Sequence, residues 1–321
     1  MDKDKKIYYG GQAVMEGIMM QGPKGKAIAC RKEDGTIVYN IQNIKQPKER
    51  YPILGWPVLR GFISFFFSMK NGVQDLTWSA AQQGETEEES LTAWDMVLAI
   101  GLALLLTVGF FVALPVWLGT VLHPYIGDFG RSLLEGVIRI SLFLGYVLAI
   151  RRLPDIKRLF AYHGAEHKTI NALEAGVILK PENVRDFSRI HTRCGTSFIL
   201  MVMVLMILIF TFIGQTKGAF GRMGIKLLLM PVVAGLSYEL FRLPLHFPNS
   251  RLVRILVAPG LAMQRLTTAE PDDSQLAIAI AAVTHVPEFE YTDQIPEPTP
   301  DPEPEPEQTP DPEQTPEPEP E

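Results

Sequence analysis

The chain has 321 residues, enough for one large or two small domains, and 47% of them are hydrophobic. Residues 1–286 hold all 30 basic groups and 23 of the 36 acidic groups, whereas residues 287–321 are mostly proline and acid. This composition excludes a packed core in the tail, which we expect to be disordered. We find no phosphate-binding glycine loop and no nucleic-acid motif, so nucleic acid is not an expected partner.

Residues 1–50 are predicted to form a small cytoplasmic β element. Segments 27–30 and 36–39 are apolar and flank Asp34-Gly35, a dipeptide typical of hairpin turns. Segment 10–20 is rich in glycine and holds Glu16 as its only charge, which fits a functional loop or a tight turn under a hydrophobic cap. Glu16 is a possible additional metal ligand.

Residues 51–93 are predicted to form an interfacial segment followed by an acidic linker. Residues 52–69 are apolar, but Pro57 and Arg60 interrupt them, so we do not expect a membrane span there. Residues 85–89 supply the acidic linker.

Residues 94–286 are predicted to form a membrane domain. Its four expected transmembrane helices cover residues 96–122, 133–150, 195–216 and 225–245. The second carries Glu135 and Arg139, and the fourth carries Glu239 and Arg242, so each polar pair can neutralise itself. The predicted fold class is therefore mainly α: a polytopic membrane protein with a small N-terminal β element and a disordered Pro/Glu tail.

The distribution of Lys and Arg predicts the orientation. Nine basic residues lie between residues 151 and 193, in the loop between the second and third spans, and others precede the first span and follow the fourth. The positive-inside rule then places both termini and the loop 154–196 in the cytoplasm, with membrane lipid as a partner. Two cysteines facing that compartment are expected to be thiols.

The cytoplasmic loop contains the pattern Tyr-His-Gly-Ala-Glu-His-Lys at 162–168. If this segment is a helix, His163 and His167 lie one turn apart on one face and can share a divalent cation. Glu166 would then be the general base, as in the H-x-x-E-H pattern. His191 and Cys194 complete a set of borderline-soft donors that suits tetrahedral zinc. The alternative is interfacial histidines and a buried thiol beside a membrane helix.

Two more glutamates bear on the ligand set. In a helix from Pro154 to about Gly176, Glu174 lies about 10 Å along the axis from His167, too far to bind the same ion. Glu239 is expected at the same membrane face and is a possible additional ligand, although an ion pair with Arg242 explains it equally simply.

Four separated motifs carry a resemblance to a known family. They are the glycine-rich segment 10–20, the histidine segment 162–168, Arg-Cys-Gly-Thr-Ser-Phe at 193–198 and Thr-Thr-Ala-Glu-Pro-Asp-Asp at 267–273. With them, residues 7 to 285 resemble the YqhQ-like bacterial membrane proteins, a family of unknown function described as predicted metal-dependent enzymes. The resemblance implies metal dependence without naming a reaction, and the residues it carries over are Glu16, His163, Glu166, His167, His191 and Cys194.

Two functions follow from these residues. The first is a metal-dependent hydrolase at the cytoplasmic membrane face, acting on an unknown substrate. The second is a membrane scaffold or assembly factor in which His163, His167, His191 and Cys194 close a structural zinc site. A transporter is a weaker third hypothesis, because the spans hold few charges and no internal repeat is evident.

Overall fold

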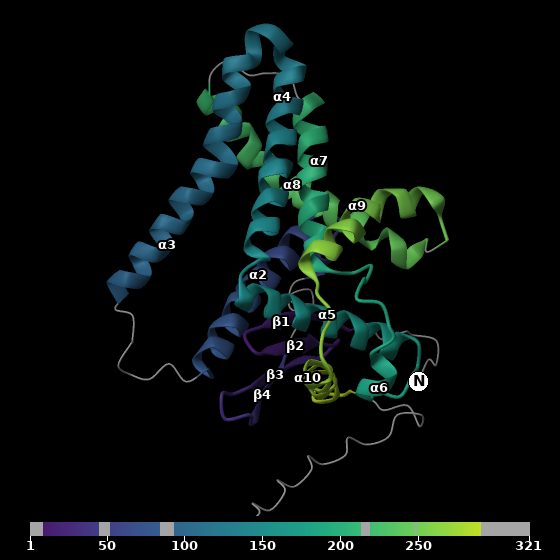
Figure 1. Ribbon diagram of the computed structural model, residues 1–321. Helices are drawn as coiled ribbons and strands as arrows, with labels where there is room; N and C mark the ends of the chain where they lie inside the picture. The colour runs from purple at the N-terminus through teal and green to yellow at the C-terminus, as the bar shows by residue number, and fades with distance from the viewer. Residues whose placement is uncertain (1–8, 45–51, 84–92, 213–218, 248, 290–321) are drawn as a thin grey trace, which may run out of the picture.

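The computed structural model of the protein describes residues 9–44, 52–83, 93–212, 219–247 and 249–289. In chain order its elements are β1 (Gly10–Val14), β2 (Gly17–Gln21), β3 (Gly25–Arg31), β4 (Ile37–Asn43), the 3-10 turn η1 (Pro52–Gly55), α2 (Leu59–Ala81), α3 (Ala93–Val108), the π-helical turn η3 (Gly109–Ala113), α4 (Leu114–Ile150), α5 (Pro154–Glu174), α6 (Pro181–Val184), α7 (Gly195–Phe212), α8 (Ala219–His246), α9 (Arg251–Thr267) and α10 (Asp273–Thr284). The sheet, α5, α6 and α10 lie at one end, and α3, α4 and α7 extend away from them (Figure 1). The described chain is therefore mainly helical with a small N-terminal sheet, as predicted.

The four strands pair antiparallel in the order β1-β2-β3-β4. The predicted turn at Asp34 and Gly35 joins β3 to β4, and Gly35 has a φ of 84°, a conformation that glycine adopts without strain. Segment 10–20 forms the β1–β2 hairpin, in which Val14 pairs with Gly17 across a tight turn.

The two central strands, β2 and β3, are buried on both faces, whereas β4 at the edge is largely exposed. Ile18 and Met20 on β2 and Ala29 on β3 face a core that Tyr162 of α5 and Leu276 of α10 complete. Since successive side chains of a strand point to opposite faces, the residues between them face the other side.

That second face packs against α2. Met19 and Ile28 lie in a small cluster with Trp78 of α2. Beside it, Lys26 forms a buried ion pair with Asp75 of α2. The segment predicted to be interfacial, residues 52–69, thus contains η1 and the first half of α2, and α2 continues to Ala81 and packs against the sheet.

An antiparallel hairpin is formed by α3, η3 and α4, and its reversal lies inside α4. The backbone angles at Gly127 (φ 65°, ψ −174°) are not helical, and the chain turns back there. The first limb therefore consists of α3, η3 and the start of α4, and the second limb is the rest of α4. The ring of Phe111 before the reversal contacts that of Tyr146 after it, with centroids 6.3 Å apart. Figure 1 shows the chain rising along α3 and returning along the second part of α4.

The charges inside this hairpin pair differently from the prediction. The ion pair of Glu135 is with Arg131, at 3.0 Å, and Arg131 also donates to the hydroxyl of Thr120. Arg139, the predicted partner, donates to the carbonyl of Phe111 on the opposite limb. Contacts between the two limbs decide which arginine pairs with Glu135, and the spacing of residues within one helix cannot reveal such contacts.

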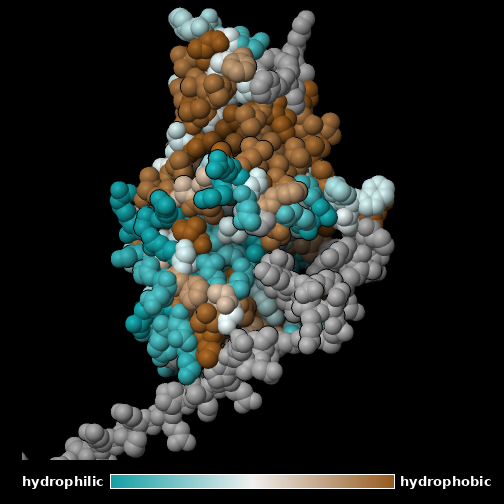
Figure 2. Space-filling view, turned by 90° about the vertical axis from the view of Figure 1, so that its right-hand side faces the viewer, coloured by the Kyte–Doolittle hydropathy of each residue, from teal (hydrophilic) through white to brown (hydrophobic). Residues whose placement is uncertain are grey.

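Two described helical stretches are long and apolar enough to cross a membrane, Gly101–Ile150 and Leu228–His246, and Gly195–Thr211 is a shorter apolar helix. The first of these contains both limbs of the hairpin. On the face shown in Figure 2, apolar side chains predominate over the upper part of the molecule and polar side chains gather below them.

The contact between Tyr9 and Phe289 bears on the predicted start of the tail at residue 287. Phe289 packs edge to face on Tyr9, with ring centroids 5.6 Å apart, so residues 287–289 of the predicted tail lie against the sheet. The rest of that tail (290–321) and the acidic linker (85–89) lie outside the described residues.

Candidate metal centre

Helix α5 positions the two central histidines. It begins at Pro154 with Asp155 in its first turn, and Gly176 follows its end with a φ of 68°, as expected from these residues. His163 and His167 lie one turn apart on this helix, with ring centroids separated by 4.4 Å. The predicted helix and the predicted shared face are both confirmed.

Backbone carbonyls fix both imidazole rings. His163 Nδ1 lies 2.8 Å from the carbonyl of Thr267, and His167 Nδ1 lies 2.6 Å from that of Arg189. A carbonyl only accepts, so each Nδ1 carries the hydrogen and each neutral ring keeps its lone pair on Nε2. Histidines that bind metals are commonly oriented in this way.

Cys194 completes a compact group of three donors. Its Sγ lies 3.1 Å from His163 Nε2 and 3.1 Å from the hydroxyl of Thr196. One donor atom each from His163, His167 and Cys194 can be chosen so that all lie within 4.8 Å of one another. Zinc ligands at bond lengths of about 2.0–2.3 Å require a similar gathering, so this cluster could bind a metal ion.

His191 lies beside the three donors but outside their group. Its ring centroid is 5.8 Å from that of His167, and its backbone is held in both directions by the buried side chain of Gln264. Its Nε2 is buried without a hydrogen bond in the described part of the chain, 3.6 Å from a carboxylate oxygen of Glu174. Burial lowers the pKa of both His167 and His191, which favours the neutral ring.

Glu166 is a buried carboxyl between α5 and β1. Gly11 has no side chain here, and a Cβ at that position would lie 2.9 Å from Glu166 Cγ. Burial raises the pKa of Glu166, while His163, His191 and the Gly11 amide counteract the rise. The carboxyl therefore lies within the electrostatic reach of the histidines without belonging to the three-donor group.

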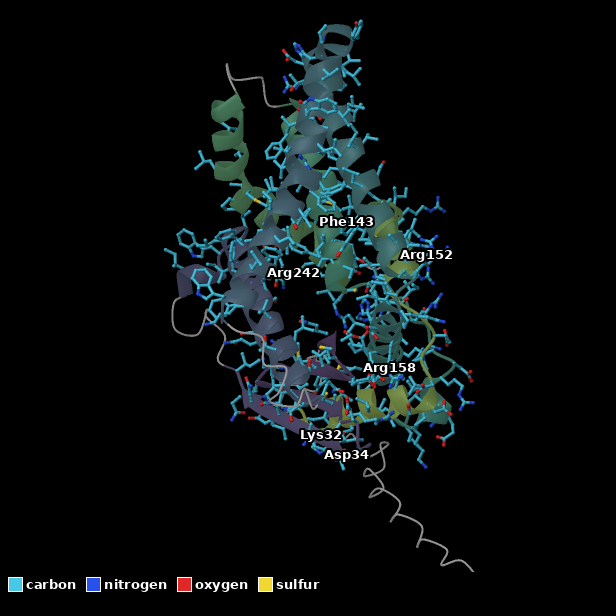
Figure 3. The ribbon with its side chains drawn as sticks, turned by 60° about the vertical axis from the view of Figure 1, so that its left-hand side comes forward. Lys32, Asp34, Phe143, Arg152, Arg158 and Arg242 are labelled. Atoms are coloured by element: carbon cyan, nitrogen blue, oxygen red, sulfur yellow. The ribbon has the colours of Figure 1, made fainter. Side chains whose placement is uncertain are left out.

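Glu16 serves an ion pair. Its carboxylate accepts hydrogen bonds from the guanidinium of Arg158 and, at 3.2 Å, from the hydroxyl of Tyr162. It thus ties the β1–β2 turn to α5 one turn before the histidines, and Figure 3 shows Arg158 at the level of the sheet.

Glu239 also forms an ion pair, but its partner differs from the predicted one. Both carboxylate oxygens accept from Arg60 of α2, with Nε at 2.7 Å from one of them. Arg242, expected to pair with it, lies over the ring of Tyr238 instead. Neither Glu16 nor Glu239 is among the three grouped donors.

Several residues that hold the site were not identified from the sequence. The carbonyls of Thr267 and Arg189 orient the rings, Gln264 fixes the backbone of His191, and buried Lys168 pairs with Glu270. Backbone carbonyls carry no residue-specific signal. Two of these residues do fall in the segment 267–273, which contributed to the family resemblance.

Comparison with known proteins places the chain in a family. A family model described as "Protein of unknown function (DUF1385)" matches residues 56–288. The "Uncharacterized protein YqhQ" of Bacillus subtilis (strain 168) is 33% identical over 300 residues, which cover 88% of this chain and 93% of that protein. No solved structure matches. The chain therefore belongs to the DUF1385, YqhQ-like family.

Proposed function

We propose that this chain is a multi-pass membrane protein that binds zinc through His163, His167 and Cys194 and acts as a hydrolase at the cytoplasmic membrane face. The observation that carries the proposal is the convergence of two oriented imidazoles and a thiol within 4.8 Å. Nitrogen and sulfur donors suit zinc among the divalent metals.

The membrane placement includes four spans. The two limbs of the α3–α4 hairpin, α7 and α8 would each cross once, which brings the start of α5 and the end of α8 to the same side. Support comes from the two long apolar stretches and from the exposed leucines and valines along α3 and α4. This arrangement keeps the sheet and the metal centre in the cytoplasm, with both termini.

Three protein donors leave one of four tetrahedral positions for substrate or solvent. A zinc ion held there would supply Lewis-acid polarisation of a substrate carbonyl or phosphoryl oxygen. Glu166 lies on α5 between the two histidines and would accept a proton from the attacking water. The substrate would be a lipid-linked molecule or a peptide bond close to the membrane interface.

Cobalt substitution tests the open coordination position without a known substrate. Co²⁺-loaded protein should show a thiolate charge-transfer band that Cys194→Ser removes, and added azide should change the cobalt spectrum. Glu166→Gln should keep this spectrum while abolishing turnover across a panel of ester, phosphoester and peptide substrates. Turnover retained by Glu166→Gln would refute its role as the base.

A second function is favoured by one observation, the buried Nε2 of His191 that has no hydrogen bond in the described residues. If this atom were the fourth ligand, the shell would be closed and the zinc would be structural. Azide would then leave the wild-type spectrum unchanged, and His191→Ala would make it sensitive. Cys194→Ser would also impair folding more severely in this case than in an open site.

A further inference from the structure

A basic cleft lies where α4 ends and α5 begins, outside the metal centre. Its volume is about 330 Å³. Its lining residues are Leu148, Arg151, Arg152, Lys157, Phe160 and Ala269. In Figure 3, Arg152 lies at this level, below Phe143 and above Arg158. Three cations therefore border one cavity at the end of an apolar helix.

No carboxylate of the described residues forms an ion pair with the cations of this cleft. Among the described residues, neither Arg151 nor Lys157 has an ion-pair partner, and Asp155, the carboxylate closest in sequence, pairs with neither. Arg152 donates to the carbonyl of Leu148 at 2.8 Å, which is a neutral acceptor.

The remaining walls are apolar and continue onto the outside of the hairpin. Leu148 is 43% exposed, and Val137, about three helical turns earlier on the same face, is exposed as well. Phe160 forms the wall on the α5 side. A ligand that fits this surface has an anionic head for the arginines and a hydrocarbon part that follows α4.

We propose that this cleft binds the phosphate headgroup of an anionic phospholipid in the cytoplasmic leaflet, an inference that rests on the proposed membrane placement. The apolar wall favours a lipid over free phosphate, since inorganic phosphate has no apolar part that could pack against Leu148. The bound headgroup lies beside the metal centre, because Phe160 is three residues before His163 on α5. The amide of Ala269, which also lines the cleft, donates to the Phe160 carbonyl at 2.8 Å.

Lipid binding by the full chain in detergent tests this site. The probe is fluorescent phosphatidylglycerol, compared with phosphatidylcholine and with inorganic phosphate as a competitor. Arg151→Gln with Lys157→Gln should weaken phosphatidylglycerol binding about 30-fold, because two cations that contribute about 1 kcal/mol each are removed and about 1.4 kcal/mol corresponds to a factor of ten. Arg151→Lys should retain binding. The matched control, Lys32→Gln with Lys180→Gln, removes the same charge outside the cleft and should have no effect.

Three results would overturn the proposal. They are equal weakening in the control, equal binding of phosphatidylcholine, and full displacement of the lipid by millimolar phosphate, which would assign the cleft to free phosphate. Membrane fractionation and zinc content of the same variants report on the proposed function separately. A membrane-bound, zinc-loaded protein with unaltered lipid binding in the cleft variant contradicts the lipid site alone.

Discussion

Single residues that bind no metal determine the geometry of the candidate centre. His163 is held by the carbonyl of Thr267, two residues before Ala269, whose own amide is fixed by the carbonyl of Phe160. Gly164 allows this close approach, because a Cβ there would collide with the carbonyl oxygen of Ala269. The glycine beside the histidine is thus as important to the ring's position as the acceptor of its hydrogen bond.

Gly164→Ala should therefore reduce metal affinity although residue 164 is not a ligand. The added methyl must push α5 away from residues 267–269, at a cost of about 1–3 kcal/mol in folding free energy. Metal titration and thermal unfolding in detergent measure the two effects. Gly145→Ala is the matched control, since a Cβ at that position would have nothing within 4 Å of it. Equal zinc affinity in the two variants would contradict this role of Gly164.

A second residue-scale prediction concerns pH. Burial raises the pKa of Cys30 from 9.0 to about 11, and a hydrogen bond from Gln83 opposes the rise. The folded state therefore keeps the thiol proton that the unfolded chain releases. This stabilisation is complete below pH 9 and is lost as the pH rises through about 11.

Between these values the unfolding temperature of the wild type should fall more steeply than that of Cys30→Ser. Serine keeps the donor to the carbonyl of Met15 but does not titrate in this range. Thermal unfolding of both proteins at pH 8, 9, 10 and 11 gives the comparison. Parallel curves would show that the buried thiol does not contribute to the pH dependence.

At the scale of elements, the sequence predicted the helix and the hairpin whose formation depends on residues close together in the chain. Helix α5 follows from Pro154 at its start and Gly176 after its end, and the β3–β4 hairpin follows from Asp34 and Gly35. The spacing of His163 and His167 then placed both rings on one face. These features depend on residues within a few positions of one another.

Contacts between distant elements could not be predicted in this way. Glu135 has an arginine four residues away on each side, and only the opposite limb of the hairpin, through Thr120 and Phe111, decides which one pairs with it. Arg60 reaches Glu239 across 179 positions of the sequence. Of the proposed ligands, Cys194 joins the histidines because the loop before α7 folds back onto α5.

The whole molecule combines a polar end that contains the sheet and the candidate metal centre with an apolar end made of α3, α4, α7 and α8. The centre lies between α5, the start of α7 and the end of α9, at the junction of the two ends. The charge pattern of the sequence predicts that the polar end faces the cytoplasm, and this orientation stays a prediction. It could not predict that the central strands β2 and β3 would be buried on both faces.

Cysteine labelling in intact cells tests the orientation. Tyr125, which is 85% exposed near the reversal of the hairpin, should lie outside, and Lys180 should lie in the cytoplasm. A membrane-impermeant maleimide should therefore label Tyr125→Cys in intact cells and Lys180→Cys only after permeabilisation. The native Cys30 and Cys194 are buried and provide the unlabelled background. Labelling of Lys180→Cys in intact cells would reverse the proposed topology.

The metal content of the purified full-length protein tests the central claim most directly. Elemental analysis should find about one zinc ion per chain in the wild type and almost none in His163→Ala with His167→Ala. The control, His123→Ala with His246→Ala, removes two histidines outside the centre and should keep the metal. A wild type without stoichiometric metal, or a His163/His167 variant that retains it, would contradict the account.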